Sequence, residues 1–396
     1  MKICDVTQFY SEVGGGVKRY LQEKRRYIER ETQDEHVLVI PGEKTAVVRE
    51  GRLTTCTVAS PKIDRTSRYR LLFNLKGAEE MIEREKPDII ESGDPYHLGW
   101  RAIDIGDRLE IPVLGFYHSH FPEAYLRTVL KYCGPWLRDA GLAYAQDYIY
   151  RLYNRFDLSL VPSQFLVDLL ASWGVTNAKR VRLGVDTSIF NSEVDAGDVR
   201  KRLNIPNDRF LLLYIGRLAG EKNSRTLMEA FRLLYKRHPK KFSFLVIGDG
   251  GLRSVVAEAR NDTESMRWIP YCNDADELAR CYRAADLFVH PGVCETFGLV
   301  TMESQACACP VVGIRGSYMD ANIFAGLEHW APSNTPAALA GAIESYLDLD
   351  CRAMGQKASQ VVLKDYTWSR VLGEMRSLYE LAIENKKREI RGGGMW

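Results

Sequence analysis

The sequence lacks long hydrophobic runs and a surplus of charge of one sign. It contains no uninterrupted apolar stretch of about 18 residues, so we expect no membrane-spanning helix. The formal net charge is only +2, which disfavours nucleic acid as a partner, because nucleic-acid-binding proteins carry a marked basic surplus. The N-terminal run meets Asp5 too early for the apolar core of a signal peptide. We therefore expect a cytoplasmic protein.

Cysteine patterns typical of disulfide frameworks or metal sites are also missing. The nine cysteines are an odd number, and no two of them form a C-x-x-C motif. Cys307 and Cys309 stand two apart without a histidine nearby, which is a poor spacing for zinc. We therefore expect free thiols in a reducing compartment and no metal site.

What the sequence does contain is an alternation of apolar runs with amphipathic stretches of helical length. Strands alternating with helices predict an α/β fold in which parallel sheets are covered by helices. Helices are expected at Ser224–Arg237 and Ala275–Ala284. The expected strands are Lys2–Val6, His36–Ile40, Ile89–Glu91, Pro112–Tyr117, Leu158–Val161, Phe210–Tyr214, Ser243–Ile247, Leu287–His290 and Val311–Gly313.

The series of strands restarts near residue 210, after the polar stretch 191–208. This restart predicts two doubly wound domains, 1–195 and 196–368, that face each other across a cleft, with residues 369–396 forming a last helix and tail. In doubly wound sheets, ligands bind at the carboxyl ends of the strands. Functional side chains are therefore expected in the loops that follow strands.

One such loop carries two carboxylates. Leu287–His290 predicts a buried strand, Glu295 lies in the loop after it, and Glu303 falls about one turn into a helix that begins near Val300. The unpaired amides at a helix N-terminus favour an anion, and carboxylates accept strong hydrogen bonds from hydroxyls. The pattern predicts a site for a ligand that has both phosphates and hydroxyl groups.

This segment also resembles the donor-site signature of a known family. Glu295 and Glu303 form E-x7-E with F-G after the first glutamate, and A-C-A-C-P-V-V follows, as in the retaining glycosyltransferase family 4 with its GT-B fold. The resemblance continues at Y-I-G-R-L-A-G-E-K-N from Tyr214, G-D-G from Gly248, and G-V-D-T-S-I-F from Gly184. It also includes the glycine loop after Val13, so that nearly the whole chain is covered in family order.

The resemblance implies a GT-B architecture of two Rossmann-like domains. The first would bind the acceptor and the second the nucleotide-sugar donor, and the last helix, near Trp368–Ile383, would return to the first domain. The implied enzyme transfers a hexose, with retained anomeric configuration, to a hydroxyl of a lipid, lipid-linked or saccharide acceptor. A UDP-sugar is the first choice of donor and GDP-mannose the second. No metal or other cofactor is implied.

The resemblance also assigns roles to individual residues. Arg217 and Lys222 would bind the diphosphate and stabilise the leaving group, which fits the general value of fixed cations where negative charge develops. Glu303 would hold the ribose hydroxyls, and Glu295 would hold the hydroxyls of the sugar. Further donor contacts are implied for Phe297, Gly298, Leu299, Gly14, Gly15 and Gly16.

The acceptor side is expected around two histidines after the strand Pro112–Tyr117. By resemblance, His118 lies near the sugar and the reacting centre, and His120 is a weaker candidate. The stretch Glu123–Ala140 then mixes leucines with basic residues. Two readings stay open for it: a helix packed on its own domain, or a peripheral contact with the inner face of a membrane.

The chain departs from the family pattern in places. The family has glycine at Ala308, and a second glycine and a glutamate at Ser317 and Asp320. The last two leave the identity of the sugar open. Two D-x-D tripeptides, 274–276 and 348–350, are interpreted as helix ends, with Asp274 or Asp276 capping the helix that follows, and not as metal ligands.

Two alternatives to a transferase remain at this stage. One is a catalytically silent nucleotide-sugar-binding or scaffold protein of the same fold, against which the intact Arg217, Lys222, Glu295 and Glu303 speak. The other is a phosphorylase-like enzyme, which would need a lysine for pyridoxal phosphate in a context that the sequence does not show.

Overall fold

The computed structural model describes residues 1–10, 15–62, 70–118, 120 and 134–392 of the chain. The chain divides into two compact units, which we call unit 1 (Met1–Leu183 with Trp368–Trp396) and unit 2 (Gly184–Thr367). The polar stretch 191–208, which the sequence places at the domain junction, lies inside unit 2. The first boundary therefore falls about a dozen residues before residue 195, and the second falls at 367/368.

Unit 1 contains one sheet of eight strands, in the order β3-β4-β2-β1-β5-β6-β7-β8. All neighbouring strands are parallel except β3 and β4. The central strands are buried along their whole length, because helices cover both faces of a parallel sheet. The strands are β1 (Lys2–Val6), β2 (Glu35–Gly42), β3 (Ala46–Glu50), β4 (Leu53–Ala59), β5 (Ile89–Ser92), β6 (Val113–Phe116), β7 (Leu158–Val161) and β8 (Ala178–Arg180).

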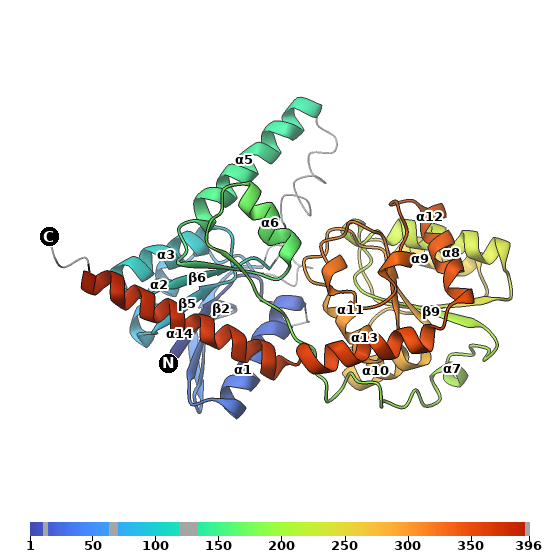
Figure 1. Ribbon diagram of the computed structural model, residues 1–396. Helices are drawn as coiled ribbons and strands as arrows, with labels where there is room; N and C mark the ends of the chain where they lie inside the picture. The colour runs from blue at the N-terminus through green and yellow to red at the C-terminus, as the bar shows by residue number, and fades with distance from the viewer. Residues whose placement is uncertain (11–14, 63–69, 119, 121–133, 393–396) are drawn as a thin grey trace. The chain divides into compact units, whose positions relative to one another are not determined.

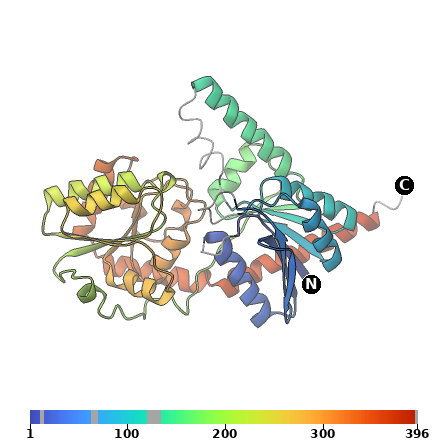
Figure 2. The ribbon, with the colours of Figure 1, turned by 180° about the vertical axis from the view of Figure 1, so that it is seen from behind.

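The helices of unit 1 pack in pairs, α1 with α14 and α2 with α3 (Figures 1 and 2). Helix α5 extends beyond the edge of the sheet in Figure 1, and its first half is exposed, including Trp136 and Tyr144. The described helices of this unit are α1 (Gly16–Glu31), α2 (Leu75–Glu85), α3 (His97–Leu109), α5 (Pro135–Tyr153), α6 (Gln164–Ser172) and α14 (Trp368–Gly392).

The return of the C-terminal helix to the first domain is confirmed. Helix α14 belongs to unit 1, where the Tyr379 hydroxyl donates a hydrogen bond to the Glu91 carboxylate on β5. Arg376, also on α14, pairs with Asp34 at 2.6 Å. The helix continues well past Ile383 to Gly392, so the basic run at its end is helical.

Unit 2 contains a five-stranded sheet in the order β11-β10-β9-β12-β13, in which every neighbouring pair is parallel. Its strands are β9 (Phe210–Ile215), β10 (Phe242–Ile247), β11 (Met266–Ile269), β12 (Leu287–His290) and β13 (Val311–Gly313). Together with unit 1, this arrangement confirms the α/β class with two Rossmann-like domains.

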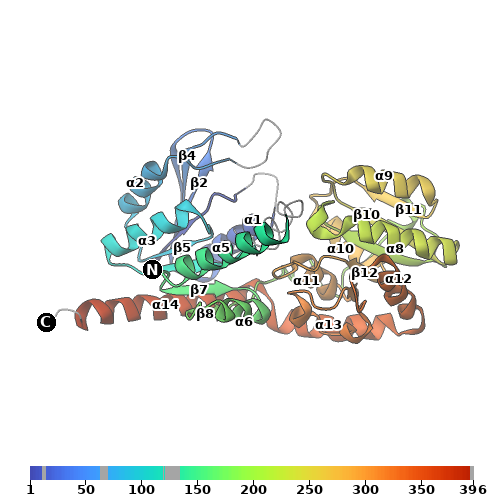
Figure 3. The ribbon, with the colours of Figure 1, turned by 90° about the horizontal axis from the view of Figure 1, so that it is seen from above.

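The helices of unit 2 form two layers, with α8, α9 and α12 on one face of the sheet and α10, α11 and α13 on the other (Figures 1 and 3). The helices are α7 (Val199–Arg202), α8 (Ser224–Arg237), α9 (Arg253–Asp262), α10 (Ala275–Ala284), α11 (Leu299–Ala306), α12 (Pro336–Ser345) and α13 (Cys351–Asp365). Short 3-10 turns are η3 (Gly220–Lys222), η4 (Asp320–Asn322), η5 (Leu327–His329) and η6 (Tyr346–Asp348).

The strand order of unit 2 locates its ligand-binding edge. The chain runs outward from β9 through β10 to β11, and then returns to the other side of β9 with β12. This reversal makes β9 and β12 the topological switch point, outside which ligands bind in doubly wound sheets. The loop with Arg217 and Lys222 follows β9, and the loop with Glu295 follows β12. The fold therefore brings the two predicted segments of the donor site to one edge.

Within the part of the chain that the structure describes, no helix combines the length and apolar character that crossing a membrane requires. Most of the stretch Glu123–Ala140, expected to be a packed or membrane-contacting helix, lies outside the described residues. Its last residues form the exposed start of α5.

Candidate functional site

The loop after β9 presents two cations at the switch point of unit 2. Lys222 ends the short turn η3, and the Arg217 side chain is 57% exposed and lies 3.7 Å from Glu221. The Tyr214 hydroxyl donates to the carbonyl oxygen of Arg217 at 2.8 Å, which holds the start of the loop against the sheet. The loop therefore presents an exposed guanidinium from a fixed backbone, beside the partly buried ammonium of Lys222.

A side-chain amide links this loop to the loop after β12. Asn223, with φ at 51°, donates from Nδ2 to the carbonyl oxygen of Pro291 at 2.8 Å. Asparagine is one of the few side chains that adopt this left-handed conformation readily. The link brings the residues that follow β9 and β12 within contact distance of each other.

The two loops meet in an ion pair. The Lys222 ammonium contacts Oε2 of Glu295, and Nε2 of His290 lies 3.8 Å from the same oxygen. Burial is the largest single influence on the pKa of Glu295 and raises it, but Lys222, His290 and Arg217 together outweigh burial and the pKa is lowered. Glu295 is therefore a carboxylate at neutral pH, which is the form that accepts hydrogen bonds from hydroxyl groups.

His290 is the last residue of β12, and its side chain is buried. Burial lowers the pKa of His290 to about 4, although the Glu295 carboxylate acts in the opposite direction. The imidazole is therefore neutral at neutral pH. Sequence reasoning did not select His290, because a histidine ending a buried strand carries no motif of its own.

A helix N-terminus begins just beyond Glu295. Helix α11 starts at Leu299, and its N-cap residue Gly298 has φ at 80°, a conformation that glycine adopts without strain. A Cβ on Gly298 would also lie 2.9 Å from the Met319 sulfur, so the position favours glycine on two grounds. Phe297 is buried, and its carbonyl oxygen accepts a hydrogen bond from Asn322 at 3.1 Å. The first amides of α11 are thus available for an anion.

Glu303 lies in the first turns of the same helix, as predicted, and only 3% of its surface is exposed. The Tyr282 hydroxyl on α10 donates to Oε2 of Glu303 at 3.1 Å. A buried carboxylate that is held by a tyrosine keeps a fixed orientation, which suits recognition of paired hydroxyls. The expected ribose role of Glu303 stays a prediction.

The departures from the family pattern have structural counterparts. The Ser317 hydroxyl donates to the Asp320 carboxylate, which also accepts from the amides of Gly316 at 2.8 Å and Ser317 at 3.2 Å. This turn therefore occupies both side chains with each other. Ala308 has φ at 56°, in the left-handed region, which explains why glycine suits this position.

The other predicted side chains are distributed over unit 1. Gly14 lies outside the described residues. Gly15 has φ at 124° and precedes α1, whose first residue is Gly16. His118 follows β6 with its ring stacked on Phe116, at 4.0 Å between ring centroids and 9° between planes. His118 is half-buried, and burial lowers its pKa to about 3.

His120 is better explained as a core residue than as an acceptor ligand. It is 2% exposed and lies against Trp173, and its Nδ1 is 2.7 Å from the Tyr117 hydroxyl. Burial lowers the pKa of His120 to about 4. Its ring is therefore neutral at neutral pH and is already bonded within the domain.

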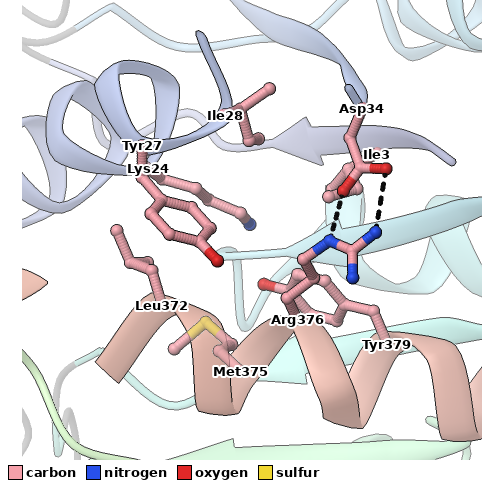
Figure 4. Close-up of a pocket in the computed structure, with 9 residues that line it drawn as sticks. All are labelled: Ile3, Lys24, Tyr27, Ile28, Asp34, Leu372, Met375, Arg376 and Tyr379. Atoms are coloured by element: carbon pink, nitrogen blue, oxygen red, sulfur yellow. Dashed lines mark hydrogen bonds and ion pairs between the residues drawn. The ribbon is translucent and has the colours of Figure 1, made fainter. Parts of the chain in front are cut away.

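Unit 1 also contains a buried charged cluster that the sequence did not reveal. Lys24 on α1 contacts Asp5 on β1 at 2.7 Å and Glu91 on β5 at 3.2 Å. His36 on β2 contacts the other oxygen of Asp5 at 2.6 Å, and the Tyr20 hydroxyl donates to Glu91 at 2.8 Å. Figure 4 shows Lys24 beside the pair formed by Arg376 and Asp34. A lysine on an amphipathic helix gives no sequence sign of such burial.

A second missed group is Asp94, which follows β5 at the carboxyl edge of the sheet. Its side chain is buried, and it accepts hydrogen bonds from the amides of Tyr96 at 2.8 Å and Gln8 at 3.4 Å. Burial raises the pKa of Asp94 to about 6, despite these bonds. The neighbouring Gly93 packs against His118, so Asp94 belongs to the same edge of unit 1.

No group of three or more potential metal-binding side chains (His, Cys, Asp or Glu) is found among the described residues. The two D-x-D tripeptides are at helix starts, as expected. Asp274 accepts from the amides of Asp276 and Glu277 at 3.0 and 3.2 Å, and Asp350 accepts from the amide of Ala353 at 2.9 Å. Both tripeptides therefore cap helices.

Comparison with known families agrees with the geometry. The model described as Glycosyltransferase Family 4 matches residues 14–189, and the model described as Glycosyl transferases group 1 matches residues 195–361. The two matches together span both units. The class defined by fold and site is that of GT-B glycosyltransferases. Within this class, the chain belongs to glycosyltransferase family 4.

Three relatives of assigned activity are named as glycosyl-transferring enzymes, and the names of the second and third include a lipid. A sulfoquinovosyl transferase of Arabidopsis thaliana is 30% identical over 59% of this chain, which covers only 44% of the plant protein. An alpha-monoglucosyldiacylglycerol synthase of Streptococcus pneumoniae is 25% identical over 76% of this chain and 69% of its own length. A GDP-mannose-dependent alpha-(1-6)-phosphatidylinositol dimannoside mannosyltransferase of Mycobacterium tuberculosis is 26% identical over 95% of both chains.

Solved structures show the same fold at lower identity. Sucrose-phosphate synthase from Thermosynechococcus elongatus matches with a TM-score of 0.75 at 20% identity, over 97% of this chain and 99% of that chain. Anabaena HepE in complex with UDP and glucose matches with a TM-score of 0.71 at 16% identity, over 96% and 99% of the two chains.

Proposed function

We propose that this protein is a retaining hexosyltransferase that takes its sugar from a nucleoside diphosphate. The observation that carries the proposal is the meeting of Lys222 and Glu295 at the switch point of unit 2, beside the exposed Arg217 and the N-terminus of α11. A nucleotide-sugar offers negative phosphates to the cations and hydroxyls to the carboxylate. The same edge of the sheet therefore carries groups that can bind the phosphates of the donor and a group that can bind its sugar hydroxyls.

The proposed reaction needs no side-chain nucleophile. The bond from the anomeric carbon to the phosphate oxygen breaks, and the acceptor oxygen bonds to that carbon on the same face. The acceptor proton passes to the leaving phosphate. Arg217 and Lys222 stabilise the negative charge that builds up on the diphosphate, which is where fixed cations contribute most. The roles that the family resemblance implies for His118, near the sugar, and for Gly14, Gly15 and Gly16, near the phosphates, stay predictions.

The reaction is tested with three variants of the donor site. Arg217→Ala, Lys222→Ala and Glu295→Ala should each lower turnover by about 100-fold or more, the typical effect of removing a group that stabilises developing charge or holds the reacting sugar. Lys201→Ala, at an exposed position on α7, is the matched control and should leave turnover unchanged. Unaltered turnover in all three site variants would contradict the proposed reaction. The anomeric proton coupling in the product reports retention directly.

The donor is proposed to be a UDP-sugar, with GDP-mannose second. A thermal-shift panel of UDP-, GDP- and ADP-sugars discriminates between them, because a ligand at 100 times its Kd stabilises the folded state by about 2.7 kcal/mol. The protein should melt at a higher temperature with one base than with the others. Transfer assays in EDTA should match those with added Mn²⁺, because Arg217 and Lys222 supply the charge that a metal provides elsewhere.

The acceptor is proposed to carry a lipid, as the names of several relatives indicate for those proteins. The exposed Trp136 and Tyr144 on α5 would then face the inner membrane surface, where aromatic side chains are favoured. Co-sedimentation with vesicles of phosphatidylglycerol tests this contact, with Trp136→Ala as the variant. A catalytically silent binding protein is the competing reading, and transfer or hydrolysis of donor by the purified protein rules it out.

A further inference from the structure

His290 lies within reach of the proposed sugar site without a role in it so far. It ends β12, only five positions before Glu295, and the turn Pro291–Gly292 folds the chain back so that the two side chains face each other. A side chain that is 3% exposed at a ligand-binding edge is held in one orientation by its surroundings. The contacts of its two ring nitrogens therefore define what it can do.

The two nitrogens of the imidazole differ in their surroundings. Nε2 is directed at Oε2 of Glu295 at 3.8 Å, slightly beyond hydrogen-bonding distance. Nδ1 is buried and makes no hydrogen bond of ordinary geometry with the described residues, although the backbone of His290 and Gly292 lies close to the ring. Gly292 packs against the ring, since a Cβ there would lie 3.0 Å from Cε1. The ring cannot swing freely, and Glu295 is the acidic side chain to which Nε2 points.

In the structure, the Lys222 ammonium is paired with Oε2 of Glu295, the same oxygen that lies nearest to Nε2 of His290. In the proposed function, the diphosphate of the donor attracts Lys222 as well. A lysine ammonium that turns to the phosphates leaves the carboxylate, and a partly buried carboxylate such as Glu295, 20% exposed, is destabilised when it loses its partner. A second donor near the same oxygen removes that cost. Nε2 of His290 would need to approach by only about 1 Å to reach the ordinary hydrogen-bond length.

The charge state of His290 suits this exchange. Its ring is neutral at neutral pH, so it can donate one hydrogen bond without cancelling the negative charge of Glu295. A second permanent cation at this place would compete with the sugar for the carboxylate. A neutral donor orients the carboxylate and leaves its other oxygen for a sugar hydroxyl.

We propose that His290 is a positioning residue for Glu295, which takes over the Oε2 oxygen through Nε2–H when the donor's diphosphate draws Lys222 away. This inference rests on the proposed donor site. It predicts that replacing His290 impairs the use of the sugar half of the donor and leaves binding of the nucleotide half unchanged. A role in the core alone would affect both halves together.

The test compares His290→Phe and His290→Gln with wild type. Phenylalanine keeps a planar ring without a hydrogen-bond donor, and glutamine keeps an N–H near the place of Nε2. For the donor that wild type uses, UDP-glucose or GDP-mannose, His290→Phe should lower kcat/KM by about 10- to 100-fold, the value of a hydrogen bond to a charged group. The Kd of UMP or GMP, which lack the diphosphate that draws Lys222 away, should change less than about twofold by the same reasoning. His290→Gln should recover most of the loss.

His238→Phe is the matched control. It removes another histidine of unit 2 that lies 3.1 Å from a glutamate, Glu344, but on the surface, and it should leave kinetics unchanged. Equal losses for nucleotide and donor in His290→Phe, or no recovery in His290→Gln, overturn the positioning role. If wild type transfers sugar and only the His290 prediction fails, the proposed function stands. If the wild-type protein transfers no sugar, both the proposed function and the positioning role of His290 are wrong.

Discussion

Lys24 has two buried carboxylates as partners, Asp5 and Glu91, and its own side chain is 2% exposed. Burial tends to lower the pKa of Lys24, but the two carboxylates outweigh it and the pKa is raised. Asp5 has its pKa lowered, because Lys24 and His36 together overcome the effect of burial. Lys24 and Asp5 are therefore ionised, whereas burial raises the pKa of Glu91 and lowers that of His36.

Replacing Lys24 should strongly destabilise unit 1. Lys24→Met leaves Asp5 and Glu91 buried side by side without a counter-charge, and breaking a buried ion pair costs about 3–5 kcal/mol. Urea denaturation measures the change. Lys76→Met, at a lysine whose side chain is 85% exposed, is the control and should change the unfolding free energy by less than about 0.5 kcal/mol. A loss below that value in Lys24→Met would show that the cluster does not contribute.

The two histidines after β6 should separate in their effects. His118→Ala should lower kcat/KM for transfer at nearly wild-type melting temperature, because His118 lies at the open edge of the sheet. His120→Ala should lower the melting temperature, because it removes a buried ring against Trp173 and leaves the Tyr117 hydroxyl without this partner. Such a loss is worth about 1–3 kcal/mol. Kinetic assays and thermal melts of both variants are the measurement. If His120→Ala lowered kcat/KM and His118→Ala lowered the melting temperature, the acceptor-side role would belong to His120.

At the scale of elements, sequence reasoning succeeded where short-range signals control structure. Parallel strands buried on both faces read as continuous apolar runs, so strands such as β1 and β12 were located to the residue. It failed at the end of α14, where the helix was expected to end near Ile383 and continues to Gly392. Lys386 there pairs with Asp157 at 3.1 Å, a contact 229 residues away in sequence. No local pattern contains such a partner.

The candidate site also contains residues that short-range sequence signals reveal and residues that only the folded structure reveals. Glu295, Glu303, Arg217 and Lys222 could be selected from the sequence because motif and helix N-terminus lie within short segments, and their roles stay predictions. The buried cluster around Lys24 was missed, because it joins α1, β1 and β5, and a lysine on a helix usually lies in solvent. His290 was missed because only the folded turn brings it to Glu295.

The junction between α11 and β13 carries strain at Ala308. Its φ of 56° lies in a region that costs an L-residue roughly 1–2 kcal/mol relative to glycine. Ala308→Gly should therefore raise the unfolding free energy by up to about 1 kcal/mol, the gain being reduced by the greater freedom of glycine in the unfolded chain. Chemical denaturation is the measurement. Ala306→Gly, inside α11, is the matched control and should destabilise instead. A loss of stability in Ala308→Gly would contradict the strain.

At the scale of the whole molecule, each unit holds at least one histidine that burial keeps neutral at neutral pH. These histidines determine how the stability of the protein changes as the pH falls. The pKa is lowered to about 3 for His118 and to about 4 for His120 in unit 1, and to about 4 for His290 in unit 2, against an ordinary value near 6.5. Between these values the unfolded chain binds the proton and the folded chain does not. Stability from each group is therefore complete above pH 6.5 and is lost as pH falls toward 4. Asp94 acts in the opposite direction, because its raised pKa favours the folded state as pH falls.

The three histidines together should outweigh Asp94, so the protein should be less stable at pH 5.5 than at pH 7.5. Each histidine contributes about 1 kcal/mol to this loss, from the shift between its folded and unfolded pKa. Urea unfolding at both pH values, on wild type and His290→Gln, isolates one group, since glutamine does not titrate. The loss on acidification should be smaller by about 1 kcal/mol in His290→Gln. Equal losses in the two proteins would mean that His290 takes up a proton as readily in the folded as in the unfolded chain.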